Sequence, residues 1–66
     1  MQVQLNGAPR DVPEAIAVAE LLTWLSITTD RVAVEVNGAV VTRARHAEVK
    51  LTAGDVVEVV TFVGGG

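Results

Sequence analysis

Hydrophobic and polar residues alternate over the first five positions of the chain, where three apolar residues are separated by two glutamines. This period of two is typical of a β-strand with one face buried and one face in water. Asn6-Gly7 follows at once and is the strongest two-residue signal for a hairpin turn. We therefore expect a second strand over residues 9–12, ended by Pro13 and lying at an edge because Pro9 has no backbone donor.

The spacing of apolar residues then changes to a helical repeat. They occupy the i, i+3, i+4 and i+7 positions of an amphipathic helix: Val18, Leu21, Leu22 and Leu25. The pattern predicts one helix that begins near Val18 and ends near Ser26. Ala17 stands where a Ser, Thr or Asp cap is expected, so the start of the helix is poorly marked.

A second hairpin pattern follows the helix. Valines alternate with other residues over positions 32–36, Asn37-Gly38 repeats the turn signal, and apolar residues resume over 39–41. After an irregular, partly polar stretch, the triplet Ala53-Gly54-Asp55 indicates a turn into a last strand over residues 56–63. The predicted order of elements is therefore ββαβββ.

This order predicts an α+β domain in which one main helix packs on the inner face of a five-strand mixed sheet. It is the β-grasp order, in which the first and last strands pair in parallel. We expect residues 1–63 to form this domain and residues 64–66 to form a flexible glycine tail. The expected core consists of Val3, Leu5, Val18, Leu21, Leu22, Leu25, Val34, Val36, Val57 and Val59.

Composition and charge narrow the classes of function. A chain of 66 residues allows one small domain, which leaves little room for an enclosed active site. Because the sequence contains no cysteine, disulfides and thiolate chemistry are excluded, and a reducing compartment fits. A formal net charge of −3 argues against a nucleic-acid partner. Neither a signal peptide nor a membrane span is visible, so we expect a cytoplasmic protein.

The sequence ends in three glycines, Gly64, Gly65 and Gly66, which carry no side chain. We expect them to hold the terminal carboxylate about 10 Å from the folded body, at roughly 3.3–3.6 Å per extended residue. Such a tail can enter a channel too narrow for other residue types, which makes the carboxylate of Gly66 the most accessible reactive group. The other interpretation is a frayed end or the remnant of an engineered linker.

Five segments together resemble the ThiS family of ubiquitin-like sulfur carriers, which serves thiamin biosynthesis. They are VQLNG (residues 3–7), VAELL (18–22), VAVEVNG (32–38), AGDVVEVV (53–60) and VGGG (63–66). Each segment is weak evidence alone, whereas the five together are specific and cover essentially the whole chain.

The resemblance implies a protein co-substrate that has no catalytic residues and binds no cofactor of its own. In this family an E1-like adenylyltransferase (ThiF-type) uses ATP to adenylate the terminal carboxylate, here that of Gly66. A sulfur-donor protein then converts the adenylate to a thiocarboxylate, and a thiazole synthase (ThiG-type) receives the sulfur. Gly64 and Gly65 are implied to be the flexible lead that enters the partners' sites.

The predicted last strand carries apolar residues on both faces, so one face leaves hydrophobic side chains outside the core. Val60 and Phe62, with Glu58 between Val56 and Val60, form a candidate docking patch close to the tail. The alternative is that edge strands or the loop around Lys50 cover these side chains. The resemblance favours docking, because ubiquitin-like proteins use this face of the sheet.

The charge of the C-terminal segment predicts the sign of the partner's surface. No basic residue follows Lys50, and Asp55, Glu58 and the terminal carboxylate give this segment a charge of −3 by direct count. We therefore expect a positively charged partner surface and an association rate that salt reduces.

Other polar residues give no sign of catalysis. His46 follows Arg43 and Arg45 in a segment that we interpret as a solvated loop, and the sequence offers no second histidine for a metal site or a proton relay. Trp24 flanks the leucine stripe and is expected at the edge of the core. Acidic residues at spacings suited to acid–base catalysis are lacking, which argues against a hydrolase.

Other functions stay open at the level of the sequence. The small subunit of molybdopterin synthase shares the fold and the diglycine end, and a sulfur carrier for another pathway fits the same features. A β-grasp module that only docks, with incidental glycines, is the alternative from a different class.

Overall fold

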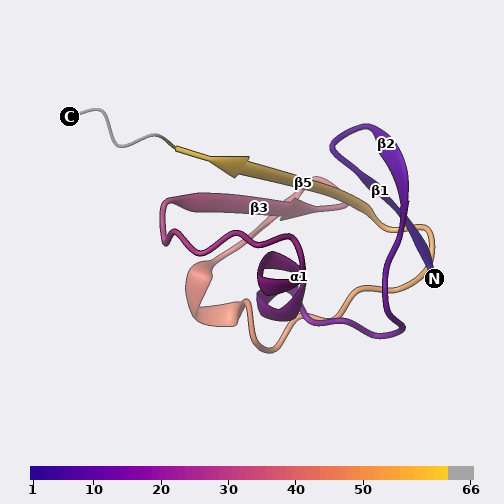
Figure 1. Ribbon diagram of the computed structural model, residues 1–66, viewed down its shortest axis with the longest axis horizontal. Helices are drawn as coiled ribbons and strands as arrows, with labels where there is room; N and C mark the ends of the chain where they lie inside the picture. Colours follow the sequence, from indigo (N-terminus) through magenta and orange to yellow (C-terminus); the bar gives the residue numbers. More distant parts are fainter. Residues whose placement is uncertain (63–66) are drawn as a thin grey trace.

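The computed structural model describes residues 1–62, which form a five-stranded sheet, one α-helix and a short 3₁₀ helix (Figure 1). The elements are β1 (Gln2–Leu5), β2 (Ala8–Asp11), α1 (Val18–Trp24), β3 (Val32–Val36), β4 (Ala39–Val41), η1 (Arg43–Arg45) and β5 (Val56–Thr61). The predicted ββαβββ order is confirmed, with η1 as an addition. β5 ends at Thr61, short of the end predicted at residue 63, which itself lies outside the described residues.

The strands lie in the order β2-β1-β5-β3-β4, so β5 occupies the middle of the sheet. β1 and β5 run parallel with Leu5 opposite Val57, which confirms the pairing predicted from the β-grasp order. The other neighbouring pairs are antiparallel. β2 is an edge strand, as Pro9 predicts. A proline has no N–H to donate, and on an edge strand that position can point to solvent, where no neighbouring strand needs the donor.

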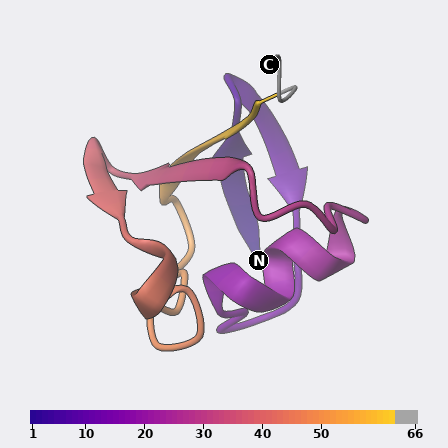
Figure 2. The same cartoon turned by 90° about the vertical axis from the view of Figure 1, so that its left-hand side faces the viewer.

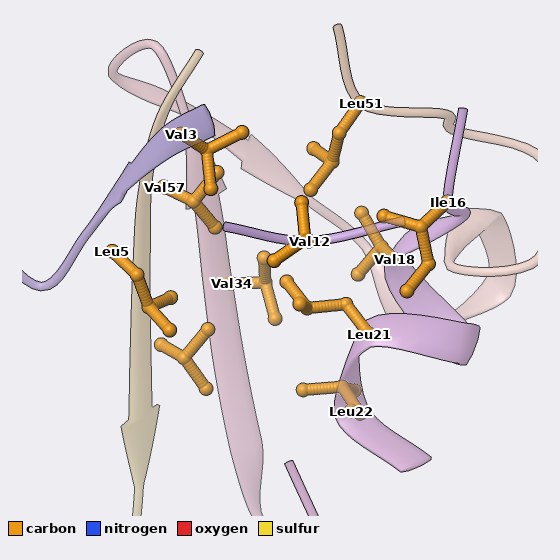
Figure 3. Packing of buried hydrophobic residues seen from close by; sticks show 11 residues of the cluster. Val3, Leu5, Val12, Ile16, Val18, Leu21, Leu22, Val34, Leu51 and Val57 are labelled. Carbon is orange, nitrogen blue, oxygen red and sulfur yellow. The ribbon is translucent and has the colours of Figure 1, made fainter. Parts of the chain in front are cut away.

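Helix α1 covers one face of the sheet and leaves the other face uncovered (Figure 2). Side chains of the helix and of the sheet point toward one another to form the core (Figure 3). The buried cluster contains Val3, Leu5, Val12, Ile16, Val18, Leu21, Leu22, Val34, Leu51, Val57 and Val59. Burial of one such side chain contributes roughly 1.5–3 kcal/mol, so this layer is the main source of stability.

The core differs from the predicted one at its margins. Leu25 and Val36, which the sequence predicts inside, are half-buried and pack against the edge of the cluster. Val12, Ile16 and Leu51 are buried although they lie outside the periodic segments. The backbone N–H of Leu51 donates to the carbonyl of Ile16 at 2.9 Å, so two irregular segments lie side by side and close the core.

The start of α1 is weakly capped, as the sequence predicts. Ala17 is the N-cap residue and offers no side-chain acceptor. Its own backbone N–H donates to Oε1 of Glu20 at 2.9 Å, which is one half of a capping box.

The end of α1 is set by Ser26, which adopts a positive φ of 62°. The N–H of Ser26 donates to the carbonyl of Thr23 at 2.9 Å, and that of Ile27 donates to the carbonyl of Leu22 at 2.8 Å. These two bonds are those of a Schellman motif, which satisfies carbonyls at a helix end. The helix therefore stops at Trp24, close to the predicted end.

The interpretation of His46 as part of a solvated loop is wrong. Its side chain is only 7% exposed, and Nε2 lies 3.2 Å from the carbonyl oxygen of Val41. Its backbone carbonyl accepts a hydrogen bond from the N–H of Ala19 in the first turn of α1, at 2.8 Å. Because η1 turns the chain back toward the helix, the imidazole is folded inward and fills space beside the core.

Candidate functional site

The outer face of β5 carries the residues that the sequence predicts as a docking patch. Val57 and Val59 point into the core, so the alternate residues Val60, Phe62 and Glu58 lie on the uncovered face. Val60 and Phe62 are each 54% exposed. Edge strands and the loop around Lys50 therefore leave these side chains in solvent, and the alternative in which they are covered is wrong.

The register of the sheet adds two residues that the sequence analysis missed. Glu35 of β3 lies directly opposite Glu58, and Val40 of β4 lies directly opposite Glu35. Val40 is 70% exposed. Glu35 alternates with Val34 and Val36, so its outward orientation had a signal in the sequence, whereas the pair Val40-Val41 gave none for Val40. Their position beside β5 depends on pairing between strands far apart in the sequence.

The side chain of Asn6 pairs with the backbone of β5. Its Nδ2 donates to the carbonyl of Val59 at 3.1 Å, and its Oδ1 accepts from the N–H of Val59 at 2.8 Å. The backbone N–H of Asn6 donates to the carbonyl of Val57 at 2.9 Å. Asn6 thus extends the β1–β5 ladder after the backbone has turned away, and β5 is held on both of its sides. Its φ of 49° is one that asparagine adopts more readily than most residues.

A second network holds the turn before β5. Asp55 accepts hydrogen bonds from the backbone N–H of Thr52 at 2.8 Å, from its hydroxyl at 3.1 Å and from Nδ2 of Asn37 at 3.0 Å. Oδ1 of Asn37 accepts from the N–H of Val56 at 2.8 Å. Burial raises the pKa of Asp55, but the hydrogen bonds from Thr52 and Asn37 outweigh it, so the pKa lies below its ordinary value.

The lowered pKa makes the contribution of Asp55 to stability depend on pH. This contribution is complete above the ordinary value of 3.8 and is lost as pH falls through the lower folded-state pKa. We expect the urea midpoints of the wild type and Asp55→Asn to differ by a constant amount from about pH 7 to about pH 4 and to converge below that. A difference that persists unchanged to about pH 3 would contradict the assignment.

The last described residue is also held in place. The N–H of Phe62 donates to the carbonyl of Arg31 at 2.9 Å, so the pairing with the β3 side continues past the end of β5. The predicted sulfur-carrying residue Gly66 and the predicted lead, Gly64 and Gly65, lie outside the described residues. β5 is therefore an ordered strand to Thr61, and its pairing with the β3 side reaches Phe62.

The side of the domain that carries α1 has a surface hollow in place of a flat sheet face. A shallow hollow there is lined by Pro13, Glu14, Ile16, Glu20, Thr23 and Trp24. The guanidinium of Arg10 lies 5.2 Å from the centre of the Trp24 ring, which is 43% exposed and is not among the side chains packed against the core, where the sequence predicts it. Residues 1–62 contain no group of His, Asp and Glu suited to a metal ion. None of the helices in that range has the length and apolar character to cross a membrane.

Several known proteins are similar to this chain. A thiazole synthase of Magnetococcus marinus is 41% identical over all 66 residues, and that of Paramagnetospirillum magneticum is 36% identical. The chain spans only 20% of the length of each of these two proteins. An uncharacterised protein of Porphyra purpurea, ycf40, is 30% identical, with the whole chain matching 93% of its length.

The solved structures point to a single family. The crystal structure of the thiamine biosynthesis protein ThiS from Geobacter metallireducens superposes with a TM-score of 0.86 at 38% identity, and each chain is covered completely. A solution structure of a thiamine biosynthesis protein from the same organism gives a TM-score of 0.83 over 88% of its length. The ThiS family model matches residues 3–66. With the β-grasp fold, this match establishes that the chain belongs to the ThiS family.

Proposed function

We propose that this chain is a sulfur carrier of thiamin biosynthesis and that the carboxylate of Gly66 carries the sulfur. The observation that supports this most strongly is the match to the ThiS family, which extends through Gly66. The related proteins are named for thiamine biosynthesis and for thiazole synthesis, which favours this pathway over molybdopterin synthesis.

Activation of the carboxylate explains why a partner enzyme is needed. A carboxylate resists attack by nucleophiles, so one oxygen of the Gly66 carboxylate first attacks the α-phosphorus of ATP, and pyrophosphate leaves. Hydrosulfide delivered by the sulfur-donor protein then adds to the acyl carbon of the adenylate, AMP leaves, and loss of the proton on sulfur gives the thiocarboxylate. The ThiF-type partner supplies the nucleotide site and stabilises the developing charge, while this chain acts as its co-substrate.

The outer face of β5 is proposed to dock on the partner and to aim the terminal glycines. Val60 lies on the outer face of β5 and Phe62 directly follows the strand, and both are half-exposed apolar side chains. Apolar anchors of this kind dominate the free energy of binding at protein interfaces. Because β5 is hydrogen-bonded along both sides, a partner that binds this face also fixes the direction in which the chain leaves Phe62.

The proposed recipient of the sulfur is a ThiG-type thiazole synthase. Two proteins named thiazole synthase contain a segment that matches this whole chain, which places a similar domain in the same polypeptide as the synthase. Joining two modules raises their effective concentration, so such a fusion is favourable for partners that must meet repeatedly.

Intact-mass spectrometry tests the proposed function. The wild-type chain is incubated with its ThiF-type enzyme, ATP and a sulfide source, and the mass is expected to rise by the difference between one sulfur and one oxygen atom. Omission of ATP is the control and should leave the mass unchanged. An unchanged mass with an enzyme shown to be active on another carrier would rule out the proposed function.

The charge of the C-terminal segment predicts how salt affects the encounter with the enzyme. Asp55, Glu58 and the terminal carboxylate are the acidic groups of this segment, and Glu35 adds a carboxyl opposite Glu58 on the proposed docking face. We expect the association rate constant to fall at least severalfold when ionic strength rises from about 0.05 M to about 0.5 M, because salt screens exposed charges. Stopped-flow measurement of association checks this, and a rate constant indifferent to salt would refute it.

A further inference from the structure

Two glutamates occupy directly opposite positions on neighbouring strands of the uncovered sheet face. Glu35 of β3 and Glu58 of β5 are directly opposite in the antiparallel register. Side chains in such a pair have Cβ atoms about 4.5–5.5 Å apart, and like charges at this distance destabilise a sheet. The pair therefore carries a repulsion that a positive group between the two carboxylates would relieve.

The surroundings of this pair are apolar. On β4, the strand that pairs with β3 on the side away from β5, Val40 lies opposite Glu35. Along β5, Val56 and Val60 are the outward-facing residues before and after Glu58. These three valines are all exposed. Apolar neighbours exclude water once a partner covers them, and this strengthens any ion pair formed at the carboxylates.

No cation of the described residues neutralises the pair. The ion pairs among residues 1–62 join the N-terminal amine to Asp11 and Glu14, Arg43 to Asp30, and Arg45 to Glu48. None of them includes Glu35 or Glu58. The guanidinium of Arg10 lies over Trp24, on the helix side of the sheet.

The negative charge of the uncovered sheet face indicates which kind of partner can bind to it. A second copy of this chain, docked through the same face about a two-fold axis, would bring four carboxylates together within an apolar interface. A nucleic acid or an anionic lipid surface would be repelled. A protein surface that combines apolar area with a cation fits both the valines and the carboxylates. A guanidinium suits the pair best, because it is planar, weakly hydrated and able to donate from two edges.

We propose that the adenylating partner inserts an arginine side chain between Glu35 and Glu58, with the neighbouring valines packed around it. This inference rests on the proposed function, since it assigns a recognition element to the enzyme that activates the chain. The pair is therefore a specificity determinant. Its repulsion slightly lowers the stability of the isolated chain, and its ion pair with the arginine stabilises the complex.

The test measures binding and stability in the same variants. Glu35→Gln and Glu58→Gln are each expected to raise the KM of the ThiF-type enzyme for the carrier by roughly tenfold, because each removes a charge-assisted hydrogen bond. Their urea midpoints should equal or exceed that of the wild type, because the repulsion is gone. Glu48→Gln is the matched control, since it makes the same change of charge at an exposed position in another part of the surface.

The variant Glu58→Lys is expected to change the stability of the domain and its recognition by the enzyme in opposite directions. A lysine at this position places an internal cation opposite Glu35, so the urea midpoint should rise above that of the wild type. The same lysine repels the partner's arginine, and KM should rise more than in either glutamine variant. A residue with a merely structural role would not change stability and recognition in opposite directions.

The outcomes distinguish this inference from the proposed function. If the wild type is adenylated and the three variants at positions 35 and 58 keep a KM within about twofold of the Glu48→Gln value, the inference is wrong while the proposed function stands. If the wild type is not adenylated by a competent enzyme, the proposed function fails and the inference fails with it.

Discussion

Deletion of Gly66 should leave the folded domain intact and reduce adenylation by the ThiF-type enzyme by at least about 100-fold, since a displacement of about 1 Å at a reacting centre can cost that much. The shortened chain ends about 3.3–3.6 Å earlier, so its carboxylate no longer reaches the α-phosphorus of ATP when β5 is docked. Intact-mass spectrometry measures the fraction of chain converted, and a urea titration measures stability.

A chain lengthened by one residue after Gly66 is the matched control. It keeps all three glycines but moves the carboxylate too far, so it should be activated as poorly as the shortened chain while folding equally well. If the chain were a module that only docks, the wild type and both variants would bind the partner, and none of the three would be modified. Full modification of the shortened chain would contradict the proposed role of Gly66.

Substitution of Asn6 by alanine is expected to destabilise the domain by about 3 kcal/mol. About 1 kcal/mol is lost with each of the two hydrogen bonds between the Asn6 side chain and Val59, and a further 1 kcal/mol or so comes from an alanine at positive φ. A domain of this length has a total stability of about 3–10 kcal/mol. The variant should therefore be partly unfolded in mild denaturant, as circular dichroism during a urea titration would show.

Asn6→Gly separates the two causes. Glycine adopts a positive φ without strain, so this variant loses only the hydrogen bonds to Val59 and should be destabilised by about 2 kcal/mol. If both variants lost the same free energy of unfolding, strain at position 6 would be negligible. If neither lost any, the side-chain pairing with β5 would not contribute to stability.

The elements with a strong local pattern could be predicted from the sequence. Asn6-Gly7 and Asn37-Gly38 each lie between alternating segments, and both mark the hairpins found in the structure. The leucine stripe of α1 has the helical period. Val57 and Val59 are buried as the expected core has them, although β5 carries apolar residues on both faces. In these segments local propensity and burial favour the same conformation, so the pattern is sufficient.

The features that the sequence did not reveal depend on contacts between distant segments. His46 and Leu51 lie in a stretch without periodicity, and only the fold of η1 against α1 turns them inward. Glu35 reads as an ordinary solvated residue until its register places it opposite Glu58. Register between non-adjacent strands is set by the packing of the whole sheet, so no local pattern could predict that pair.

The central position of β5 links assembly of the sheet to formation of the proposed docking face. The two hairpins, β1–β2 and β3–β4, do not pair with each other, and β5 alone joins them into one sheet. β5 follows both hairpins in the chain, so it is the last of the described elements to be synthesised and the sheet cannot close before it. The pairing of β5 then completes the sheet and forms the outer face of β5 in the same step. On the proposed function, chains that stop short of β5 would present neither the docking face nor the terminal glycines to the activating enzyme.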